Sequence, residues 1–393
     1  MNQKIADPTA QELMLDFARL TGLDPPSPDP RRYLWTDAFA VPNYLQLFIQ
    51  TGDSTYRDLA LRLVDQVHHA LGRHRADDPR EGWISGLDDE EGEIHPTAGG
   101  LRIGKRYNER GTSDPFDEQL EWDRDGQYYH YLTKWMHALN CAGQVAGDPT
   151  YLRWAMELAR TAHARFVVAP PGGVGKRIRW KMSIDLSRPL VPSMGQHDPL
   201  DGLVTCCELQ AASSRYFGED GSPPLDLRSE IAELAEIVRG IDLATADPLG
   251  IGGLLFDAYR IGQLMILYGL EDGKLLGAVL EAALMGMEAL LSSGSLDRRA
   301  EYRLAFRELG LSIGLSAAEE LMRLLEENSG SFDQRGSLQK LIEELVTFSP
   351  LRTVIEGFWM DGGNRKARTW TDHREINMVM LATSLAPGRF LLI

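Results

Sequence analysis

The stretch AFAVPNYLQLFIQTGDSTYRDLALRLVDQVHHAL, residues 38–71, shows the unit from which we expect most of the chain to be built. Its first part, near 38–50, is apolar on most faces, which is typical of a helix that other helices enclose. Its second part, near 54–74, predicts an amphipathic helix, because apolar residues recur every three or four positions. Glycine suits the end of one helix and aspartate the start of the next, so Gly52-Asp53 predicts a tight turn between the two.

The same order of buried helix, glycine–acid turn and amphipathic helix returns along the chain. We expect six buried helices, near 38–50, 126–146, 199–217, 253–270, 302–318 and 373–386. Six amphipathic helices are expected near 10–21, 54–74, 150–167, 224–240, 273–293 and 335–347. The spacing of these hairpins is irregular, which argues against a solenoid of identical short repeats.

Composition bounds the class of protein. The chain has 393 residues, of which 43% are hydrophobic, so a large core is available without a disulfide or metal staple. A net charge of −16 argues against nucleic acid or an anionic membrane as the main partner. The three cysteines suit free thiols, and no apolar leader or run of about 18 apolar residues is apparent. We therefore expect a soluble cytoplasmic protein.

An aromatic residue stands next to a carboxylate before several of the buried helices. The tripeptide Trp-Thr-Asp occurs at Trp35–Asp37 and again at Trp370–Asp372, and a looser version lies at Glu121–Asp125. Long connections, 75–124 and 168–197, also fall before buried helices, and loops of that length are usually functional. If the helices form a ring, their starting ends share the floor of one cleft. Such a cleft favours an enzyme that acts on sugars or similar polyols.

With its two sets of six helices, its aromatic–acid pairs and its long connections on one side, the chain resembles the six-hairpin, (α/α)6-toroid glycosidase superfamily. The resemblance covers most of the chain and is architectural, since no short motif identifies one family within the superfamily. It implies an all-α toroid of inner and outer helices, in a single domain spanning 1–393, with long loops on one rim. The same fold hosts sugar epimerases, polysaccharide lyases and terpenoid cyclases.

Three aspartates are the candidate catalytic residues. Hydrolysis of a glycosidic bond needs a proton donor and a second carboxylate, about 5–10 Å apart. We expect Asp125 to be the general acid, because acids, an arginine, tyrosines and a histidine surround it in the sequence. Asp198 or Asp37 is the expected general base. Pro42 predicts that the regular helix starts nearer Val41, which would leave Asp37 above its end. Helix capping is the alternative role for aspartates at helix starts, and a surface ion network is the alternative for the cluster around Asp125.

Aromatic and polar residues near the same helix starts are candidates for substrate binding. Tryptophan can stack on a sugar ring while its N–H donates to a hydroxyl, although loop tryptophans can also simply anchor long loops. The expected stacking platforms are Trp35, Trp122 and Trp370. The other expected substrate-binding residues are Tyr129, His130, His197, Asp372 and His373.

The sequence thus favours hydrolysis of a glycosidic bond in a short oligosaccharide or glycosylated metabolite, with no cofactor and no metal. A sugar epimerase or isomerase that uses His130, His197 or His373 is the first alternative. A terpenoid cyclase would need an aspartate-rich motif, and residues 88–91 match one poorly. A non-catalytic helical scaffold is the third alternative. The oligomeric state does not follow from the sequence.

Overall fold

The computed structural model describes residues 7–169, 175–217, 226–270, 272–328 and 335–393. The chain forms two compact units. Unit 1 consists of Met1–Phe17, Ile49–Thr51 and Asp242–Ile393, and unit 2 of Ala18–Phe48 and Gly52–Ile241. The expectation of a single domain stays a prediction.

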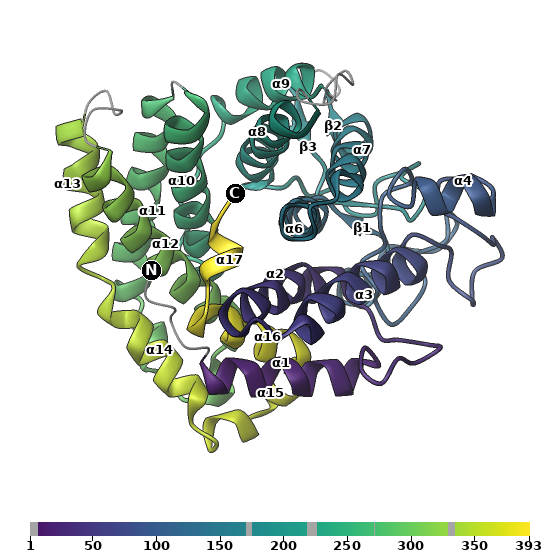
Figure 1. Ribbon diagram of the computed structural model, residues 1–393, viewed down its shortest axis with the longest axis horizontal. Helices are drawn as coiled ribbons and strands as arrows, with labels where there is room; N and C mark the ends of the chain where they lie inside the picture. The colour runs from purple at the N-terminus through teal and green to yellow at the C-terminus, as the bar shows by residue number, and fades with distance from the viewer. Residues whose placement is uncertain (1–6, 170–174, 218–225, 271, 329–334) are drawn as a thin grey trace. The chain divides into compact units, whose positions relative to one another are not determined.

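Unit 2 contains three helical hairpins. Their helices are α2 (Leu34–Thr51, with its last turn in unit 1), α3 (Ser54–Leu71), α6 (Tyr129–Ala146), α7 (Pro149–Phe166), α8 (Asp198–Phe217) and α9 (Arg228–Val238). Helix α6 packs against both α7 and α8, and α8 packs against α9 (Figure 1). The predicted glycine–aspartate turns are confirmed: Gly52 and Gly147 adopt left-handed conformations, and Asp53 and Asp148 cap the helices that follow them.

The long connections of unit 2 carry short elements. These are α4 (Asp89–Ile94), α5 (Glu118–Glu121), β1 (Gln127–Tyr128), β2 (Val167–Val168), β3 (Arg177–Ile178) and β4 (Lys181–Met182). Strand β1 pairs antiparallel with β4, and β2 pairs antiparallel with β3. The first pairing joins the connection that precedes α6 to the connection that precedes α8.

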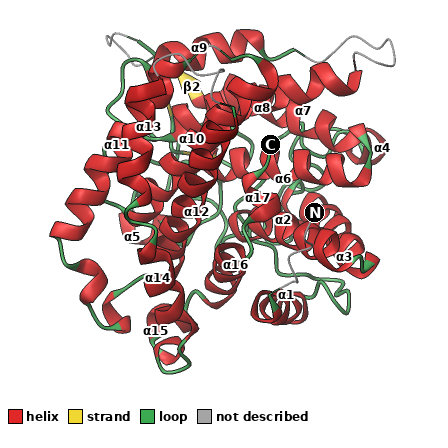
Figure 2. Ribbon diagram, turned by 60° about the vertical axis from the view of Figure 1, so that its left-hand side comes forward, coloured by secondary structure: helices red, strands yellow, loops and turns green. Residues whose placement is uncertain are grey.

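Unit 1 is also helical (Figure 2). Its helices are α10 (Pro248–Tyr268), α11 (Gly273–Ser292), α12 (Ala305–Glu327), α13 (Arg335–Val346), α14 (Pro350–Met360), α15 (Arg368–Thr371), α16 (Arg374–Leu385) and α17 (Gly388–Leu391), together with most of α1 (Pro8–Thr21). Three 3-10 turns are Ser295–Asp297, Ala300–Tyr302 and Asn364–Lys366. Helix α12 packs against α10, α13, α14 and α16.

All twelve predicted helices are present, and most of their ends differ by a few residues. Three details of the prediction were wrong. Helix α12 runs to Glu327, well beyond its predicted end near 318. Helix α2 begins at Leu34 and runs through Pro42, because one missing N–H removes a single hydrogen bond from a helix that tertiary packing stabilises. Helix α14 was not predicted, and Trp359 lies inside it, fully buried.

Three glycines allow α10 and α12 to approach each other closely. A Cβ atom built on Gly314 would lie 2.5 Å from the Cα of Gly252, and one built on Gly252 would lie 2.1 Å from the carbonyl oxygen of Gly310. These contacts involve backbone atoms, which cannot rotate away as a side chain would. Gly310 and Gly314 therefore mark a helix crossing within the continuous helix α12.

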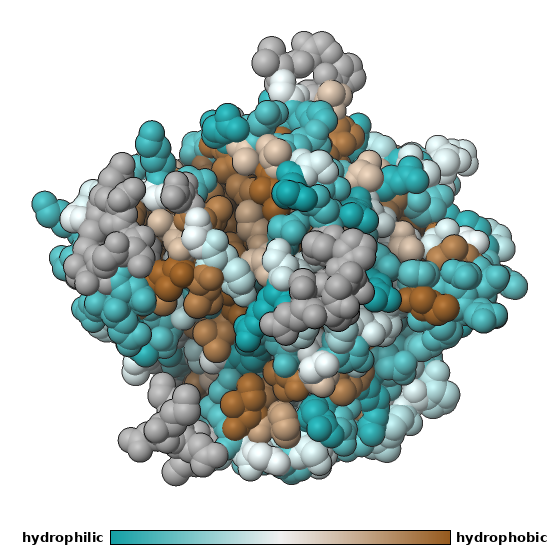
Figure 3. Space-filling model, turned by 45° about the horizontal axis from the view of Figure 1, so that its top comes forward, coloured by the Kyte–Doolittle hydropathy of each residue, from teal (hydrophilic) through white to brown (hydrophobic). Residues whose placement is uncertain are grey.

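One helix in the described part of the chain, α11, is long and apolar enough to span a membrane by length and composition. In the relevant window 44% of it is buried, and its buried positions, such as Leu276, Val279, Leu280, Ala283 and Met287, follow a helical stripe. On the face seen in Figure 3, hydrophobic and hydrophilic residues are interspersed. The stripe is typical of a helix that packs on a protein core.

We expect Gly314→Ala to destabilise the protein by about 1–3 kcal/mol, because the added methyl group meets the backbone of α10. The matched control is Gly253→Ala, also on α10, where an added Cβ has no neighbour within 4 Å. That change should instead stabilise by about 0.5–1 kcal/mol through helix propensity. Urea unfolding of both variants measures the two changes in unfolding free energy. Equal changes of the same sign would contradict the close crossing of α10 and α12.

Candidate functional site

The starting ends of α2, α6 and α8 come together in unit 2. The ring centroid of Trp35, in the first turn of α2, lies 5.9 Å from that of His130, in the first turn of α6. Nδ1 of His130 lies 3.7 Å from Oδ1 of Asp198, the first residue of α8. These three helix starts therefore share one environment, as the sequence predicted.

Aromatic rings surround His130. Its ring centroid lies 5.4 Å from Tyr128 and 4.9 Å from Tyr131, and Trp180 is nearly parallel to it at 6.4 Å. Trp180 is placed there by the pairing of β1 with β4, which sets Tyr128 opposite Lys181. We call Trp35, Tyr128, His130, Tyr131, Trp180 and Asp198 the His130 cluster.

Three polar atoms of the His130 cluster are buried without a hydrogen bond to any described residue. They are Nε1 of Trp35, Nδ1 of His130 and Oδ2 of Asp198. Trp35 and Asp198 are each only 6% exposed, so these atoms have little access to bulk water. An unsatisfied buried polar group costs about 1–3 kcal/mol, and proteins retain few of them. Three on neighbouring residues leave room for partners from outside the described part of the chain.

Asp37 lies close to this cluster in sequence, but its carboxylate is directed to its own helix start. Oδ2 accepts a hydrogen bond from the backbone N–H of Tyr33 at 3.0 Å, and Oδ1 lies 3.3 Å from the guanidinium of the buried Arg32. Burial raises the pKa of Asp37 to about 6, although Arg32 and the Tyr33 N–H act in the opposite direction. Both carboxylate oxygens thus have partners within the protein.

Asp125 is fully buried and ion-paired. Its Oδ2 accepts a hydrogen bond from Arg102 at 2.6 Å, and its Oδ1 accepts one from the backbone N–H of Gly104 at 3.0 Å. The guanidinium of Arg75 lies 3.5 Å away. This arrangement ties the connection after α3 to the segment before α6, so it favours a structural role over the catalytic one expected from the sequence.

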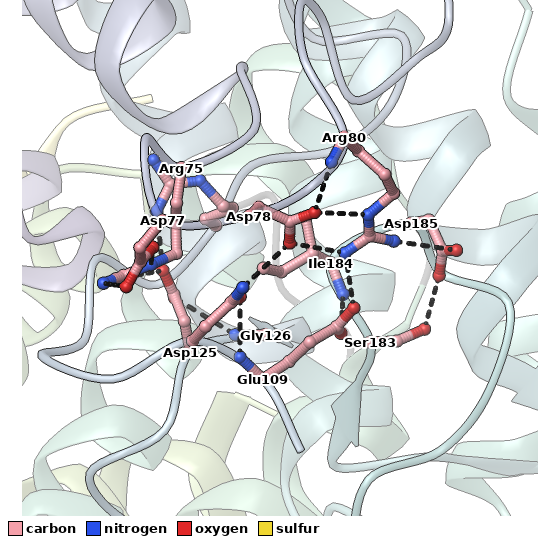
Figure 4. Close-up of polar contacts among 12 residues, drawn as sticks. Arg75, Asp77, Asp78, Arg80, Glu109, Asp125, Gly126, Ser183, Ile184 and Asp185 are labelled. Carbon is pink, nitrogen blue, oxygen red and sulfur yellow. Dashed lines mark hydrogen bonds and ion pairs between the residues drawn. The ribbon is translucent and has the colours of Figure 1, made fainter. Parts of the chain in front are cut away.

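A second ionic network holds the same connections (Figure 4). Arg80 binds Asp78 at 2.8 Å, Glu109 at 2.7 Å and Asp185 at 3.2 Å, and Glu109 also accepts a hydrogen bond from the backbone N–H of Ile184. The hydrogen bond from Arg80 holds the pKa of Asp78 far below its ordinary value. The network therefore fixes the loop that carries Trp180 against the loop that leads to α6.

Three other residues of unit 2 were expected at the site: Trp122, His197 and Tyr129. Trp122 is half exposed and meets the edge of Trp180, with ring centroids 5.2 Å apart. His197 directly precedes α8 and is partly exposed. Tyr129 does not join the His130 cluster: it is buried against Phe166 and packs tightly against Gly202. Burial raises its pKa well above the ordinary value for tyrosine.

The remaining expected residues belong to unit 1. Trp370 is buried and stacks on Trp359 at 5.8 Å, while Asp372 is exposed and lies 3.5 Å from Arg368. His373 is exposed and meets the edge of Phe306 at 5.6 Å. Their expected position beside Trp35 and Asp37 stays a prediction.

Two small pockets also lie in the described part of unit 2. One, of about 170 Å³, is lined by Trp122, Tyr128 and Trp180 among others. The other, of about 120 Å³, contains Asp65, His69 and Glu93, whose charges already pair with one another. Hydrogen bonds that His69 donates, first to Asp65 and also to Glu93, raise its pKa to about 9 although burial opposes them. In the described ranges no group of three or more His, Cys, Asp or Glu side chains could hold a metal ion.

Sequence reasoning left Tyr128, Tyr131 and Trp180 out of the site. Tyr128 and Tyr131 flank His130 closely, and this aromatic density was a usable signal. Trp180 lies about fifty residues further along the chain, and only the pairing of β1 with β4 brings it to His130.

No family model and no curated protein matches this chain. Among solved structures, an inactive double Asp-to-Asn variant of an α-1,6-mannanase of Salegentibacter, in complex with α-1,6-mannotriose, is similar over 98% of this chain and 99% of its own, with 11% identity and a TM-score of 0.53. A family 76 α-mannanase of Bacteroides thetaiotaomicron is similar over 97% of both chains, with 9% identity and a TM-score of 0.51.

The chain has the all-α (α/α)6-toroid fold. The resemblance to the six-hairpin glycosidase superfamily is thereby confirmed at the level of the fold. A cellobiose 2-epimerase from Spirochaeta thermophila is similar over 95% of this chain and 97% of its own, with 14% identity and a TM-score of 0.47, which is too low to carry an argument.

The raised pKa of Asp37 predicts a specific dependence of stability on pH. Between about pH 4 and pH 6 the unfolded chain ionises Asp37 while the folded protein keeps it protonated, so ionisation favours unfolding. The unfolding free energy of the wild type should therefore fall, relative to that of Asp37→Asn, by roughly 2–4 kcal/mol as the pH rises from about 4 to 7. Urea titrations at several pH values measure this difference, and parallel curves for the two proteins would refute it.

Proposed function

We propose that this protein is a carbohydrate-active enzyme in which His130 exchanges a proton with a bound sugar and Asp198 orients the imidazole. The observation that carries the proposal is the His130–Asp198 pair, 3.7 Å apart, among aromatic rings and buried polar atoms without described partners. Neither ring nitrogen of His130 forms a hydrogen bond with a described residue, so the ring is available to a ligand.

A sugar matches the chemistry of the His130 cluster. Its C–H faces pack on aromatic rings, and its hydroxyls can bind Nε1 of Trp35 and Oδ2 of Asp198. The mannanases with the same fold support this substrate class, since one of them was solved with a mannotriose. The net charge of −16 further favours an uncharged substrate over a polyanion.

Proton transfer is the reaction that this pair supports best. A separation of 3.7 Å is too long for a hydrogen bond, and such contacts often tighten when substrate binds. With Asp198 holding Nδ1, Nε2 would remove the proton from the carbon next to the carbonyl of an open-chain sugar. The C–H electron pair becomes a C=C bond and the carbonyl π electrons move to the oxygen, which gives an enediolate and an imidazolium. If the enediolate turns its other face to the imidazolium, return of the proton to the same carbon re-forms the carbonyl and gives an epimer. Return of the proton to the former carbonyl carbon, with the neighbouring hydroxyl proton passing to the enediolate oxygen, gives an isomer.

Glycoside hydrolysis is the second candidate. Asp198 has an unpartnered oxygen that could serve as acid or base, and the mannanases of the same fold favour this reaction. Asp37 and Asp125, the other expected members of a carboxylate pair, are each bound to a buried arginine. A terpenoid cyclase has less support, because Asp88 caps α4 and Asp89 pairs with Arg73.

Free aldoses in deuterated water separate the two reactions. We expect NMR to show deuterium entering at the carbon next to the carbonyl, and His130→Gln to slow this exchange by about 10²–10⁴-fold. Asp198→Asn should slow it by at least tenfold, since it removes the group that orients the ring. The reverse pattern would favour hydrolysis: release of free sugar from glycosides, lost in Asp198→Asn and kept in His130→Gln.

Asp125→Asn is the matched carboxylate control. It should lower the unfolding free energy by about 3 kcal/mol, because it leaves Arg102 buried without its counter-charge. At a temperature where the variant stays folded, its turnover should remain near that of the wild type. Full activity of His130→Gln on every substrate would overturn the proposal.

A further inference from the structure

We propose that the 170 Å³ pocket beside Trp180 is a second sugar subsite, so that the preferred ligand is a disaccharide or longer oligosaccharide whose second ring is uncharged or an amino sugar. This inference rests on the proposed function, because it takes the His130 cluster as the site of the reacting ring.

Aromatic side chains give the pocket the character of a sugar platform. Phe116 and Trp122 line it, and each is 50% exposed, although burying such large rings is normally favourable. Trp122 meets Trp180 edge to face at 5.2 Å, so the two indoles form a corner. A corner of this kind can pack against one face and one edge of a pyranose ring.

The pocket is continuous with the His130 cluster through shared walls. Trp180 and Tyr128 line the pocket, and both also pack against His130, at 6.4 Å and 5.4 Å between ring centroids. Trp180 therefore borders both the His130 cluster and the pocket. Two linked sugar rings can lie on the two sides of this wall.

Charge in the pocket decides which sugars it accepts. The ammonium of Lys181 donates hydrogen bonds to the carbonyl oxygens of Glu121 and Arg124, at 2.6 Å and 2.8 Å, and to the Glu121 carboxylate. That carboxylate also binds Arg110 at 3.1 Å, so these charges are compensated.

Glu118 remains as the lining charge that forms no ion pair with a described residue. Its carboxylate can accept hydrogen bonds from sugar hydroxyls or from an ammonium group. It repels the carboxylate of a uronic acid and the phosphate of a sugar phosphate. The pocket therefore selects against anionic second rings.

Equilibrium binding, measured by calorimetry on the full chain, tests the subsite. The probes are mannose with α-1,6-mannobiose, and glucose with cellobiose. We expect at least one disaccharide to bind tenfold or more tightly than its monosaccharide. Trp122→Ala, and independently Phe116→Ala, should reduce that ratio to threefold or less. Leu120→Ala, in helix α5 between these two residues but outside the pocket lining, should leave the ratio unchanged.

Charge selection has its own measurement. A further probe is a disaccharide whose second ring is a uronic acid. Glu118→Gln should bind this probe about threefold more tightly than the wild type does at low salt, and should bind the neutral disaccharide with unchanged affinity. If the ratio of disaccharide to monosaccharide affinity were unchanged in both Trp122→Ala and Phe116→Ala, the subsite would be overturned. Monosaccharide binding would in that case still support the proposed function. Failure of the wild type to bind any of these sugars would overturn both.

Discussion

Gln127 is the residue on which the arrangement of unit 2 depends, because its buried side chain joins three separate parts of the chain. Its Oε1 accepts a hydrogen bond from the backbone N–H of Leu101 at 2.9 Å, and its Nε2 donates to the carbonyl oxygens of Gly99 and Ile184 at 3.0 Å and 2.7 Å. Gly100 adopts a φ of +77°, and a Cβ there would lie 2.1 Å from Oε1 of Gln127. Since Gln127 also opens strand β1, the same residue sets the pairing that brings Trp180 to His130.

Most of the buried charged groups discussed in unit 2 hold loops in place, whereas those of the His130 cluster stay available to a ligand. Arg102, Arg80 and Arg32 engage the carboxylates that fix the connections and the start of α2. The pairs of Arg102 and Arg32 are buried, and removing one partner of a buried ion pair strongly lowers stability, so these pairs hold their segments in one geometry. The His130 cluster differs, since three of its buried polar atoms form no hydrogen bond with a described residue. Preorganised groups of this kind are what a binding site needs and what a stable core avoids.

The helices could be predicted from the sequence because their signals are local. Apolar periodicity and the glycine–aspartate turns lie within a few residues of each helix boundary, and all twelve predicted helices are present. Pro42 misled the prediction, since its local preference is outweighed by the burial of α2. Gly310 and Gly314 did so as well, because their role is contact with a helix more than fifty residues away.

The site was predicted only in part, for a related reason. Trp35, His130 and Asp198 follow from their places at helix starts, and the structure brings them together. Tyr129 was chosen beside His130, but neighbouring residues on a helix point about 100° apart, so it faces the core instead. Asp125 was chosen for its polar surroundings, whereas its buried partner, Arg102, comes from a distant loop. Whether a carboxylate is paired depends on the tertiary structure, and the spacing of residues along the sequence does not reveal it.

The most direct measurement is a crystal structure of the wild-type protein with a bound sugar. The account predicts a sugar ring against Trp35 and Trp180, with one polar atom within about 3.2 Å of His130 and another within that distance of Asp198 Oδ2. A sugar bound away from these residues, with His130 and Asp198 contacting only other protein side chains, would contradict it.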